Sequence, residues 1–416
     1  MATTIWLLAF GAASLLAVPA AIYTIECLAG ALPRRRDRHA GGQSRPAIAI
    51  LVPAHDEALG ITRTVESVRA QMRAGDRLVV IADNCSDNTA ALARKAGAEV
   101  IERTDPSRKG KGYALDFGIS HLASAPLPVV AFVDADCTLT AGTLDALSCL
   151  VSSQDRPVQA SNLMITRGDQ KEVFGISEFA FMVKNHVRTR GLNLMGLPCQ
   201  LTGTGMALPW RLASSAHLAS GEIVEDMKLG LDLAAAGHYP LYCEEAGVRS
   251  YFPDTAASAQ IQHRRWEHGH LGIMISGLRR LAKWRCFSLP YAAMILDVMV
   301  PPLMLLVFMI VGLTVISAAV AVAGLGYLPL LLCAVLFMMV TGGTLIAWLV
   351  HGRRILPPSS LLLLPKYLAS KIALYVEMFF SRSPKISWVR TSRASTVPPS
   401  AGETMNSRHS TTNYRN

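Results

Sequence analysis

Two carboxylates one residue apart follow a short apolar run, at Asp134-Ala135-Asp136. Alternate residues of a strand point to opposite sides, but both carboxylates can reach one ion where the strand gives way to a loop. Mg²⁺ and Mn²⁺ favour such ligands, together with the phosphates of a substrate. A bound divalent ion neutralises charge that develops on a leaving diphosphate. The pair therefore predicts metal-assisted chemistry on a phosphate-bearing substrate.

A basic stretch, Arg108-Lys109-Gly110-Lys111-Gly112, precedes a predicted helix at 113–123. Lysines between glycines near a helix N-terminus suit a phosphate, because free backbone N–H groups and the helix dipole favour an anion there. The spacing is not that of a Walker A loop, which needs GxxxxGK[ST]. Lys109 and Lys111 are therefore candidate phosphate ligands, and a solvated basic loop is the alternative.

The stretch 262–270, QHRRWEHGH, concentrates histidine and arginine around one tryptophan. A metal cluster, a nucleic-acid patch, a membrane-surface anchor and part of an active site are all compatible with this composition. The spacing of His263, His268 and His270 does not bring three imidazoles to one helical face, which disfavours the metal cluster. The remaining choices depend on what surrounds the stretch.

The elements that must position these residues alternate between strand and helix. Such alternation predicts right-handed crossovers and an α/β, doubly wound, mostly parallel sheet, in which ligands bind beyond the carboxyl ends of the strands. Apolar runs predict strands at 47–52, 78–82, 99–102 and 129–133, and amphipathic patterns predict helices at 61–72, 89–96, 113–123, 143–151 and 226–236.

Polar side chains follow three of these strands. Pro53-Ala54-His55-Asp56-Glu57 ends the first strand, a run beginning at Asp83 ends the second, and Asp134 and Asp136 end the fourth. Asp and Asn are also ordinary turn and N-cap residues, which is the alternative for each cluster. All three clusters are expected on the same edge of the sheet, which favours a site there.

The composition indicates membrane spans. The chain of 416 residues is 51% hydrophobic and only 17% charged, whereas soluble domains are about 25% charged. Positions 298–350 contain no Asp, Glu, Lys or Arg, which is enough for two spans of about 20 residues. Pro301-Pro302 should kink or begin the first, and 324–329 should form the turn between them. A third apolar run at 5–32 reads as an uncleaved signal-anchor, because its basic residues follow it.

Basic residues set the expected orientation and domain limits. Arginines at 34–38 and 353–354 favour the cytoplasm for residues 34–290 and for the end of the last span. Residues 365–380 predict an interfacial amphipathic helix, with a fourth span as the alternative. The expected units are a signal-anchor at 1–33, a basic linker at 34–46, a cytoplasmic domain at 47–285, two transmembrane helices at 286–354, an interfacial segment at 355–390 and a disordered tail at 391–416.

Charge and cysteine content exclude other classes. The formal net charge of +10 comes partly from the juxtamembrane runs and the tail, so anionic lipid headgroups explain it better than nucleic acid. The eight cysteines form no CxxC pair, which fits reduced cytosolic thiols. Basic residues and a tryptophan just before the spans are expected to be membrane-surface anchors: Arg279, Arg280, Lys283, Trp284 and Arg285.

Together these motifs resemble those of membrane-bound family 2 glycosyltransferases with the GT-A fold, the group of cellulose, chitin and hyaluronan synthases. The resemblance covers about residues 47–285 and includes a match to the QxxRW motif at Gln262, Arg265 and Trp266. Asp56 stands where many members carry Asn, and Val224 where many polymerising members carry Thr.

The resemblance implies a role for each matched residue. Asp226 would be the catalytic base, which fits the need of a sugar hydroxyl for a proton acceptor. Arg265 can grip a diphosphate and the Trp266 indole can carry a sugar ring. The implied donor-binding residues are Pro53, His55, Glu57, Asp83, Lys109, Lys111 and Asp134; the metal ligands are Asp136 and Asp134; the acceptor and diphosphate residues are Gly203, Thr204, Gly205, Glu225, Gln262, Arg265 and Trp266.

The implied function is inverting transfer from a nucleotide sugar, UDP-glucose or UDP-N-acetylglucosamine, to a membrane-proximal glycan or lipid-linked acceptor, with a β-linkage and with Mg²⁺ or Mn²⁺. Cell-surface or exopolysaccharide synthesis at the inner (plasma) membrane is the expected setting, with membrane lipids and other polysaccharide-assembly proteins as partners and no nucleic acid. The alternatives are single-sugar transfer to a lipid carrier, a nucleotidyltransferase and a non-catalytic membrane scaffold. A nucleotidyltransferase is disfavoured because residues 53–57 replace its glycine-rich basic loop.

Overall fold

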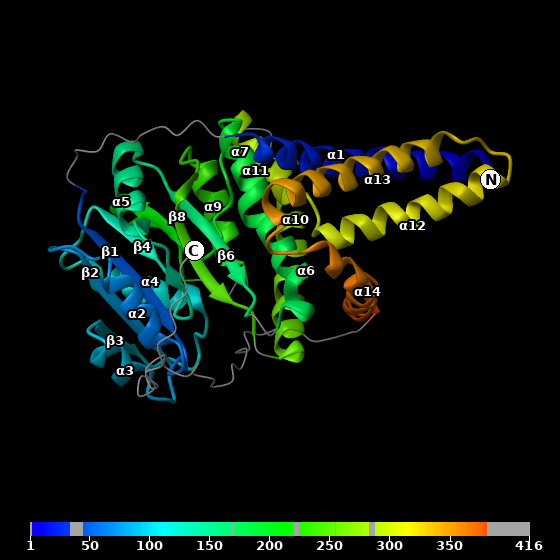
Figure 1. Cartoon of the computed structure of the whole chain (residues 1–416). Helices are drawn as coiled ribbons and strands as arrows, with labels where there is room; N and C mark the ends of the chain where they lie inside the picture. The colour runs from blue at the N-terminus through cyan, green and yellow to red at the C-terminus, as the bar shows by residue number, and fades with distance from the viewer. Residues whose placement is uncertain are drawn as a thin grey trace, which may run out of the picture.

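The computed structural model describes residues 2–33, 45–167, 170–219, 224–253, 255–282 and 288–380. An α/β body and a bundle of long helices lie end to end, with α10 and α6 between them (Figure 1). The arginines at 34–38, the residues Lys283, Trp284 and Arg285, and the tail at 391–416 lie outside the described residues.

One eight-stranded sheet forms the α/β body, in the order β3-β2-β1-β4-β7-β6-β8-β5. Its first four strands are parallel. Three of them form where short runs rich in Val and Ile are buried on both faces, as in sheets covered by helices on either side. The edge strand at 99–103 is only partly buried. These strands are β1 (Ile48–Ala54), β2 (Arg77–Asp83), β3 (Glu99–Arg103) and β4 (Val129–Phe132).

The other half of the sheet is mixed. β7 is antiparallel to β4 and β6, β8 is parallel to β6, and β5 is antiparallel to β8. The prediction of an α/β doubly wound sheet is confirmed, but the sequence pattern did not reveal these strands, because two of them are very short and polar or charged residues interrupt the other two. They are β5 (Thr138–Leu139), β6 (Val158–Ile165), β7 (Met206–Pro209) and β8 (Leu241–Tyr251).

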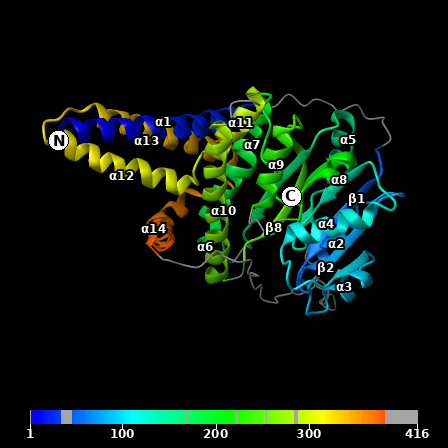
Figure 2. The ribbon, with the colours of Figure 1, turned by 180° about the vertical axis from the view of Figure 1, so that it is seen from behind.

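Helices cover both faces of the sheet (Figures 1 and 2). The predicted helices agree with the observed ones to within a few residues. The helices of the α/β body are α2 (Ile61–Arg69), α3 (Thr89–Lys95), α4 (Lys111–Leu122), α5 (Thr143–Gln154), α8 (Trp210–Ser215) and α9 (Glu225–Ala235). The helices that face the bundle are α6 (Lys171–Met182), which continues through the π-helical turn η2 (Val183–Arg188) into α7 (Thr189–Leu194), then α10 (Ala256–Ala282) and α11 (Leu289–Val298).

Three helices of the described chain are long and apolar enough to span a membrane, at Thr3–Ala31, Leu303–Val322 and Leu328–Gly352. They confirm the predicted single N-terminal and two C-terminal spans. They are α1 (Ala2–Ala31), α12 (Leu303–Val322) and α13 (Leu328–Ala347), the last continued by η4 (Trp348–Gly352). As predicted, Pro302 precedes α12 and a short turn joins α12 to α13.

The predicted interfacial helix is α14 (Leu364–Phe380), which follows η5 (Pro358–Leu363) and is not among the three candidate spans. Lys371 makes a buried ion pair of 2.6 Å with Glu267 of α10. Ile372 and Val376 are instead exposed. α14 therefore turns a charged face toward the protein and apolar side chains outward, which suits a helix at a membrane interface.

A buried cation joins the first span to the α/β body. The guanidinium of Arg188 on η2 lies 2.6 Å from Glu26 of α1 and 2.6 Å from Asp297 of α11. All three side chains are largely enclosed. Removing one partner of a buried ion pair leaves an uncompensated charge, so this triad constrains where the span meets the body.

Two glycines let α1 approach the body at backbone distance. A Cβ on Gly191 would lie 2.1 Å from the carbonyl oxygen of Glu26, and a Cβ on Gly30 would lie 2.1 Å from that of Val187. No side chain fits at either point. Small residues at a helix crossing allow this kind of close packing.

The C-terminal carbonyls of α1 are also satisfied from the body. The Arg190 guanidinium donates to the carbonyls of Gly30 and Leu32, the latter at 2.7 Å, and His351 Nε2 lies 3.1 Å from the Gly30 oxygen. The last carbonyls of a helix have no partner within the helix and carry partial negative charge. A cation there stabilises the end of the span that faces the body.

One expectation about basic residues is wrong. Arg280 was expected to be a membrane-surface anchor, but its guanidinium donates to Asp232 of α9 at 2.6 Å. The carboxylate comes from a distant part of the chain, so the local sequence does not reveal the pairing. Arg280 thus ties α10 to the helix that begins at Glu225.

Replacing Arg188 by Met should lower the free energy of unfolding by about 3–5 kcal/mol, because Glu26 and Asp297 lose their buried counter-ion. The control is Arg94→Met, which removes an exposed pair with Glu102 and should cost at most about 1 kcal/mol. Unfolding of the purified protein in neutral detergent measures both. Equal stability of the two variants would contradict the structural role of Arg188.

Candidate active site

A cavity of about 360 Å³ lies between the carboxyl edge of the central strands and the helices that lead to the candidate spans. Its volume is in the usual range for small-molecule sites. The predicted residues that line it are Lys111, Asp134, Asp136, Gly203, Thr204, Glu225, Asp226, Gln262, Arg265 and Trp266. Six predicted residues do not line it: Pro53, His55, Glu57, Asp83, Lys109 and Gly205.

Lys111 at the start of α4 organises the sheet side of the cavity. Its ammonium pairs with the Asp134 carboxylate and donates to the carbonyl of Gly203 at 2.7 Å. Burial alone would lower the pKa of Lys111, but the charges of Asp134 and Glu225 raise it above its ordinary value. Lys111 is therefore a cation held at the end of β4, where an anionic ligand would meet it.

The paired carboxylates offer hard oxygen ligands to a cation. Ligand atoms of Asp134, Asp136 and Cys137 lie within 4.8 Å of one another. Burial and both carboxylates raise the pKa of Cys137 well above its usual value, so its sulfur remains a thiol. The two aspartates are the ligands that remain, and they fit Mg²⁺ or Mn²⁺ better than a thiophilic metal.

Asp226 lies in the first turn of α9, facing Lys111 across Gly203. A Cβ on Gly203 would lie 2.9 Å from Asp226 Oδ2 and 3.2 Å from Lys111 Nζ. The other carboxylate oxygen accepts from the backbone N–H of Met227 at 2.8 Å. Burial raises the pKa of Asp226, which makes it a stronger base than an exposed aspartate. A larger residue at Gly203 would fill the space between the Asp226 carboxylate and the Lys111 ammonium.

Glu225 titrates together with Asp226. Burial and the charge of Asp226 raise the pKa of Glu225 to about 7. Lys111 opposes this shift. Two buried carboxyls side by side cannot both ionise easily, so one of them holds a proton near neutral pH.

The QxxRW stretch lies on α10, with Gln262, Arg265 and Trp266 all on the cavity wall. Burial lowers the pKa of Arg265, and the charges of Glu225 and Asp134 oppose that shift. The guanidinium therefore lies within electrostatic reach of the acidic residues of the site. The Trp266 ring packs 5.8 Å from Phe181 and 6.0 Å from His263, which holds it beside the cavity.

The histidines of this stretch do not form a metal site among the described residues. Burial lowers the pKa of both His263 and His270 to about 3, so they are neutral at physiological pH. His270 Nε2 donates to the carbonyl of Val300 at 3.1 Å. His270 therefore fixes α10 against the start of α12.

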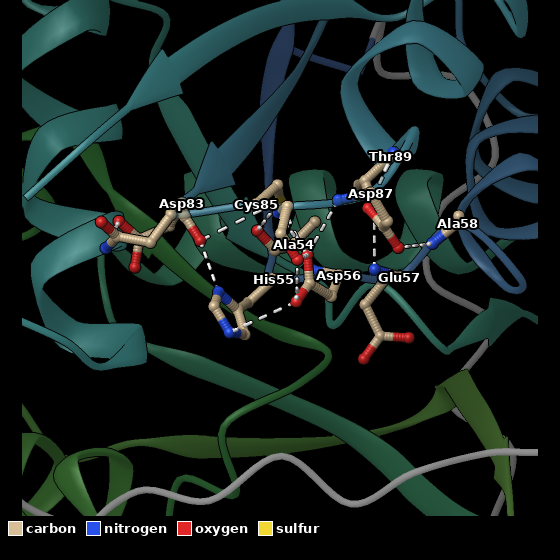
Figure 3. A network of polar contacts seen from close by, with 11 residues as sticks. Ala54, His55, Asp56, Glu57, Ala58, Asp83, Cys85, Asp87 and Thr89 are labelled. Atoms are coloured by element: carbon tan, nitrogen blue, oxygen red, sulfur yellow. Dashed lines mark hydrogen bonds and ion pairs between the residues drawn. The ribbon is translucent and has the colours of Figure 1, made fainter. Parts of the chain in front are cut away.

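A second polar network lies at the ends of β1 and β2, outside the cavity (Figure 3). His55 Nδ1 donates to the carbonyl of Asp83 at 2.7 Å. The Asp83 carboxylate accepts from Arg103 of β3 at 2.6 Å. The predicted donor residues His55 and Asp83 thus lie next to each other, and Arg103 already compensates the charge of Asp83.

Asp56 fastens this network together. It has a positive φ of 53°, which Asp tolerates better than most residues. Its carboxylate accepts the backbone N–H groups of Ser86 at 2.6 Å and Asp87 at 3.2 Å. Figure 3 shows the Glu57 side chain turned away from Asp87. The Asp56 oxygens already accept these N–H groups. The group of Asp56, Cys85 and Asp87 therefore serves to hold the two loops together.

The remaining predicted residues have other surroundings. Pro53 is the fifth pair of the β1–β2 register, opposite Ile81. Lys109 is exposed on the loop before α4. A Cβ on Gly205 would lie 2.5 Å from Val248, so packing within the sheet accounts for this glycine.

The membrane-facing wall of the cavity contains residues that the motifs did not indicate. No sequence signal singles out Lys184, because the stretch 173–187 also contains Glu178, Asn185 and His186. The residues of this wall come together only by folding. This wall includes Tyr23, Lys184, Asn185, Arg188, His270, Asp297, Val298, Val300, Pro301, Pro302, Leu303, Met304, Tyr367, Lys371 and Tyr375.

Comparison with known families agrees with the geometry. Residues 46–269, more than half of the chain, match the family described as "Glycosyltransferase like family 2". The match begins before β1 and ends inside α10, so it contains the strand-end clusters, both acidic pairs and the QxxRW stretch.

Curated relatives match over shorter parts. An uncharacterized glycosyltransferase of Mycobacterium tuberculosis is 32% identical over 119 residues, which are 27% of this chain and 50% of that protein. The 4,4'-diaponeurosporenoate glycosyltransferase of Staphylococcus aureus is 33% identical over 109 residues, 26% of this chain and 28% of that protein. The chain spans half or less of the length of these relatives.

One solved structure is similar over nearly the whole chain. It is the mannosyltransferase from Pyrobaculum calidifontis in complex with GDP-Man and Mn²⁺, with a TM-score of 0.52 and 18% identity. The match covers 92% of this chain and 99% of that chain. The likeness confirms the expected GT-A-type fold.

Gly203→Ala should abolish most transfer activity, by about 100-fold, because the new methyl group displaces Asp226 and Lys111. Gly142→Ala is the matched control, since both glycines have φ of +79° but nothing lies within 4 Å of a Cβ at Gly142. Each variant should lose about 1–2 kcal/mol of stability from the left-handed backbone. Thermal unfolding and transfer assays measure the two effects, and equal activity of both variants would refute the steric argument.

Proposed function

The chain belongs to glycosyltransferase family 2, and on this premise we propose that it transfers a sugar from a nucleotide-sugar donor to an acceptor held at the membrane. One observation carries the proposal. A buried carboxyl, a cation and a pair of metal-suited aspartates meet in a cavity that also reaches the start of a candidate span.

Asp226 is the proposed base. The acceptor hydroxyl forms a bond to the anomeric carbon as the bond from that carbon to the diphosphate oxygen breaks, and its proton passes to Asp226. The raised pKa of Asp226 supports this role, because a base is most effective when its pKa is near the working pH. Single displacement inverts the configuration, so an α-linked donor would give a β-linkage.

Cations on two sides of the cavity are proposed to bind the diphosphate. Lys111 lies on the sheet side and Arg265 lies on α10. The charges of Asp134 and Glu225 act to raise the pKa of both cations. Arg265 can bind two phosphate oxygens with its planar guanidinium. Asp134 and Asp136 would hold Mg²⁺ or Mn²⁺, which when bound supplies Lewis-acid stabilisation of the leaving diphosphate.

The nucleoside is proposed to lie along the ends of β1 and β2, near His55 and Asp83. This edge adjoins the metal-suited pair, because a Cβ on Gly60 would lie 3.8 Å from the Asp136 Cα and 3.9 Å from Glu57 Oε2. A uridine nucleotide carrying glucose or N-acetylglucosamine is the proposed donor. The Asp83 carboxylate would then accept hydrogen bonds from both Arg103 and a ribose hydroxyl.

The acceptor is proposed to be lipid-linked or a membrane-proximal glycan. The cavity wall opposite the sheet includes Pro301, Pro302 and Leu303 at the start of α12, and Tyr367 of α14. An acceptor anchored in the lipid could enter there. Processive synthesis would require the product to leave by another route, whereas addition of a single sugar would not.

The catalytic body is proposed to face the cytoplasm from the inner (plasma) membrane. The ends of α1 and α13 nearest the body lie beside each other, since His351 contacts Gly30. Arg353 and Arg354 follow directly after η4, which continues α13. Basic residues at the body side of the spans favour the cytoplasmic face.

The direct test supplies the purified protein with a panel of nucleotide sugars, Mg²⁺ or Mn²⁺, and membrane lipid extract. Release of the nucleotide identifies the donor, and the size of the labelled product identifies the mode. One added sugar supports single transfer, and a ladder of products supports processive synthesis. If the folded protein released no nucleotide with any donor, the proposal would be contradicted.

Asp226→Asn should leave donor binding within about twofold and reduce transfer by about 10²–10⁴-fold, the usual contribution of a general base. Asp116→Asn on α4, which does not line the cavity, is the control. Calorimetric titration of donor with Mn²⁺ and a transfer assay separate the two effects. Transfer by Asp226→Asn at the control's rate would remove Asp226 from the base role.

Transfer should slow as the pH is lowered through about 7, because the Glu225–Asp226 pair takes up a proton there. Asp226 must be ionised to accept a proton, so activity is present above this range and lost below it. Glu225→Gln removes a neighbouring charge and should move the midpoint to lower pH. A profile of kcat/KM against pH checks this, and an unchanged midpoint would show that the two carboxyls titrate independently.

A further inference from the structure

Lys184 is a cation in the cavity that no described partner binds. Its side chain is exposed to the cavity space although protein surrounds it. The other two cations of the membrane-facing wall are paired, Arg188 with Glu26 and Asp297, and Lys371 with Glu267. No hydrogen bond or ion pair of the Lys184 ammonium is found among the described residues.

Lys184 lies in an unusual helical turn of the backbone. Residues 183–188 form a π-helix, and such turns widen a helix and occur often at functional sites. The carbonyl of Lys184 accepts from the Thr189 hydroxyl at 3.2 Å, five residues on. Lys184 and Arg188 both line the cavity, but Arg188 is bound by its two carboxylates.

The surroundings of Lys184 suit an amphiphile. The cavity wall at the start of α12 is apolar, with Val300, Pro301, Leu303 and Met304. α12 is a candidate membrane span. An apolar chain could therefore extend from this wall into the lipid, while its polar end reaches the sheet side of the cavity.

We propose that Lys184 binds an anionic group, a phosphate or a carboxylate, in the head of an amphiphilic acceptor. This inference rests on the proposed function and names the acceptor class: a lipid whose head carries both an anion and a free hydroxyl. The hydroxyl is the reacting group, because Asp226 serves to take up its proton. The anion at Lys184 orients the acceptor and takes no part in the bond changes.

The electrostatics agree with this role. Burial and the charge of Arg188 lower the pKa of Lys184, and Asp226, Asp297 and Glu267 only partly oppose the shift. A cation that protein surrounds, and that has no hydrogen-bonded counter-ion, is costly. An anionic ligand would remove that cost, whereas a neutral ligand would not.

The test measures binding of decyl phosphate, decanoate and decyl β-glucoside to the purified full chain in neutral detergent, without donor. The rise in the thermal unfolding midpoint with probe concentration reports affinity. The variants are Lys184→Met and, as a matched control for non-specific attraction, Lys366→Met on the exposed side of α14. Equal chain lengths make partition into detergent comparable among the three probes.

Wild type and Lys366→Met should bind at least one anionic probe tenfold or more tightly than the glucoside. Lys184→Met should bind all three equally weakly, and Lys184→Arg should restore the preference. Decyl phosphate and decanoate distinguish a phosphate from a carboxylate head. No anionic preference in wild type would overturn the proposal. Loss of glucoside binding in Lys184→Met would also overturn the proposal, since the role of Lys184 would then be structural.

Failure of the proposed function would look different. If no nucleotide sugar released its nucleotide but wild type kept the Lys184-dependent preference, the anion site would stand and the transferase proposal would fall. If release occurred and the preference did not, the reverse would hold. The two conclusions therefore depend on separate measurements.

Discussion

The contact of Arg188 with Glu26 and Asp297 is the constraint on which the arrangement of this molecule depends. It joins three segments that are far apart in the chain: the first candidate span, the π-helical turn and the helix before the second span. Backbone packing of Gly30 and Gly191 allows the approach, and the triad makes it specific. Because the cavity lies between the sheet and these same segments, its membrane-facing wall exists only when this junction is made.

The other wall depends on a balance of charge at the carboxyl edge of the sheet. Lys111 compensates Asp134, while Asp226 and Glu225 stay close enough to share a proton. Gly203 supplies a carbonyl to the lysine and leaves the space in which the Asp226 carboxylate and the Lys111 ammonium face each other. The same low-dielectric enclosure that raises the pKa of Asp226 also strengthens its interaction with any positive charge nearby.

Helix α10 links the two walls. Arg265 and Trp266 face the acidic residues of the cavity, and the next residue, Glu267, holds α14 through Lys371. His270, one turn on, holds the start of α12. Movement of α14 or α12 would therefore also move the QxxRW residues on α10. A single helix therefore connects the membrane-facing wall to the proposed diphosphate site.

The sequence alone determined the parallel strands, the strand-end clusters and the three spans, because each depends on local composition: buried apolar runs, polar residues where they end, and long uncharged segments. Among the ten predicted residues that line the cavity, Asp134 and Asp136 follow from the rule that such strand ends share an edge. Lys111 follows from its glycine-flanked basic loop, and the other seven follow only from the resemblance to family 2 glycosyltransferases. Only the tertiary structure decided which charges are paired. Arg280 binds Asp232, Asp83 binds Arg103, and Gly205 packs on Val248. The structure also decided that Lys184 lines the cavity. Electrostatic pairing depends on distances between residues that are remote in sequence, and no local sequence pattern contains those distances.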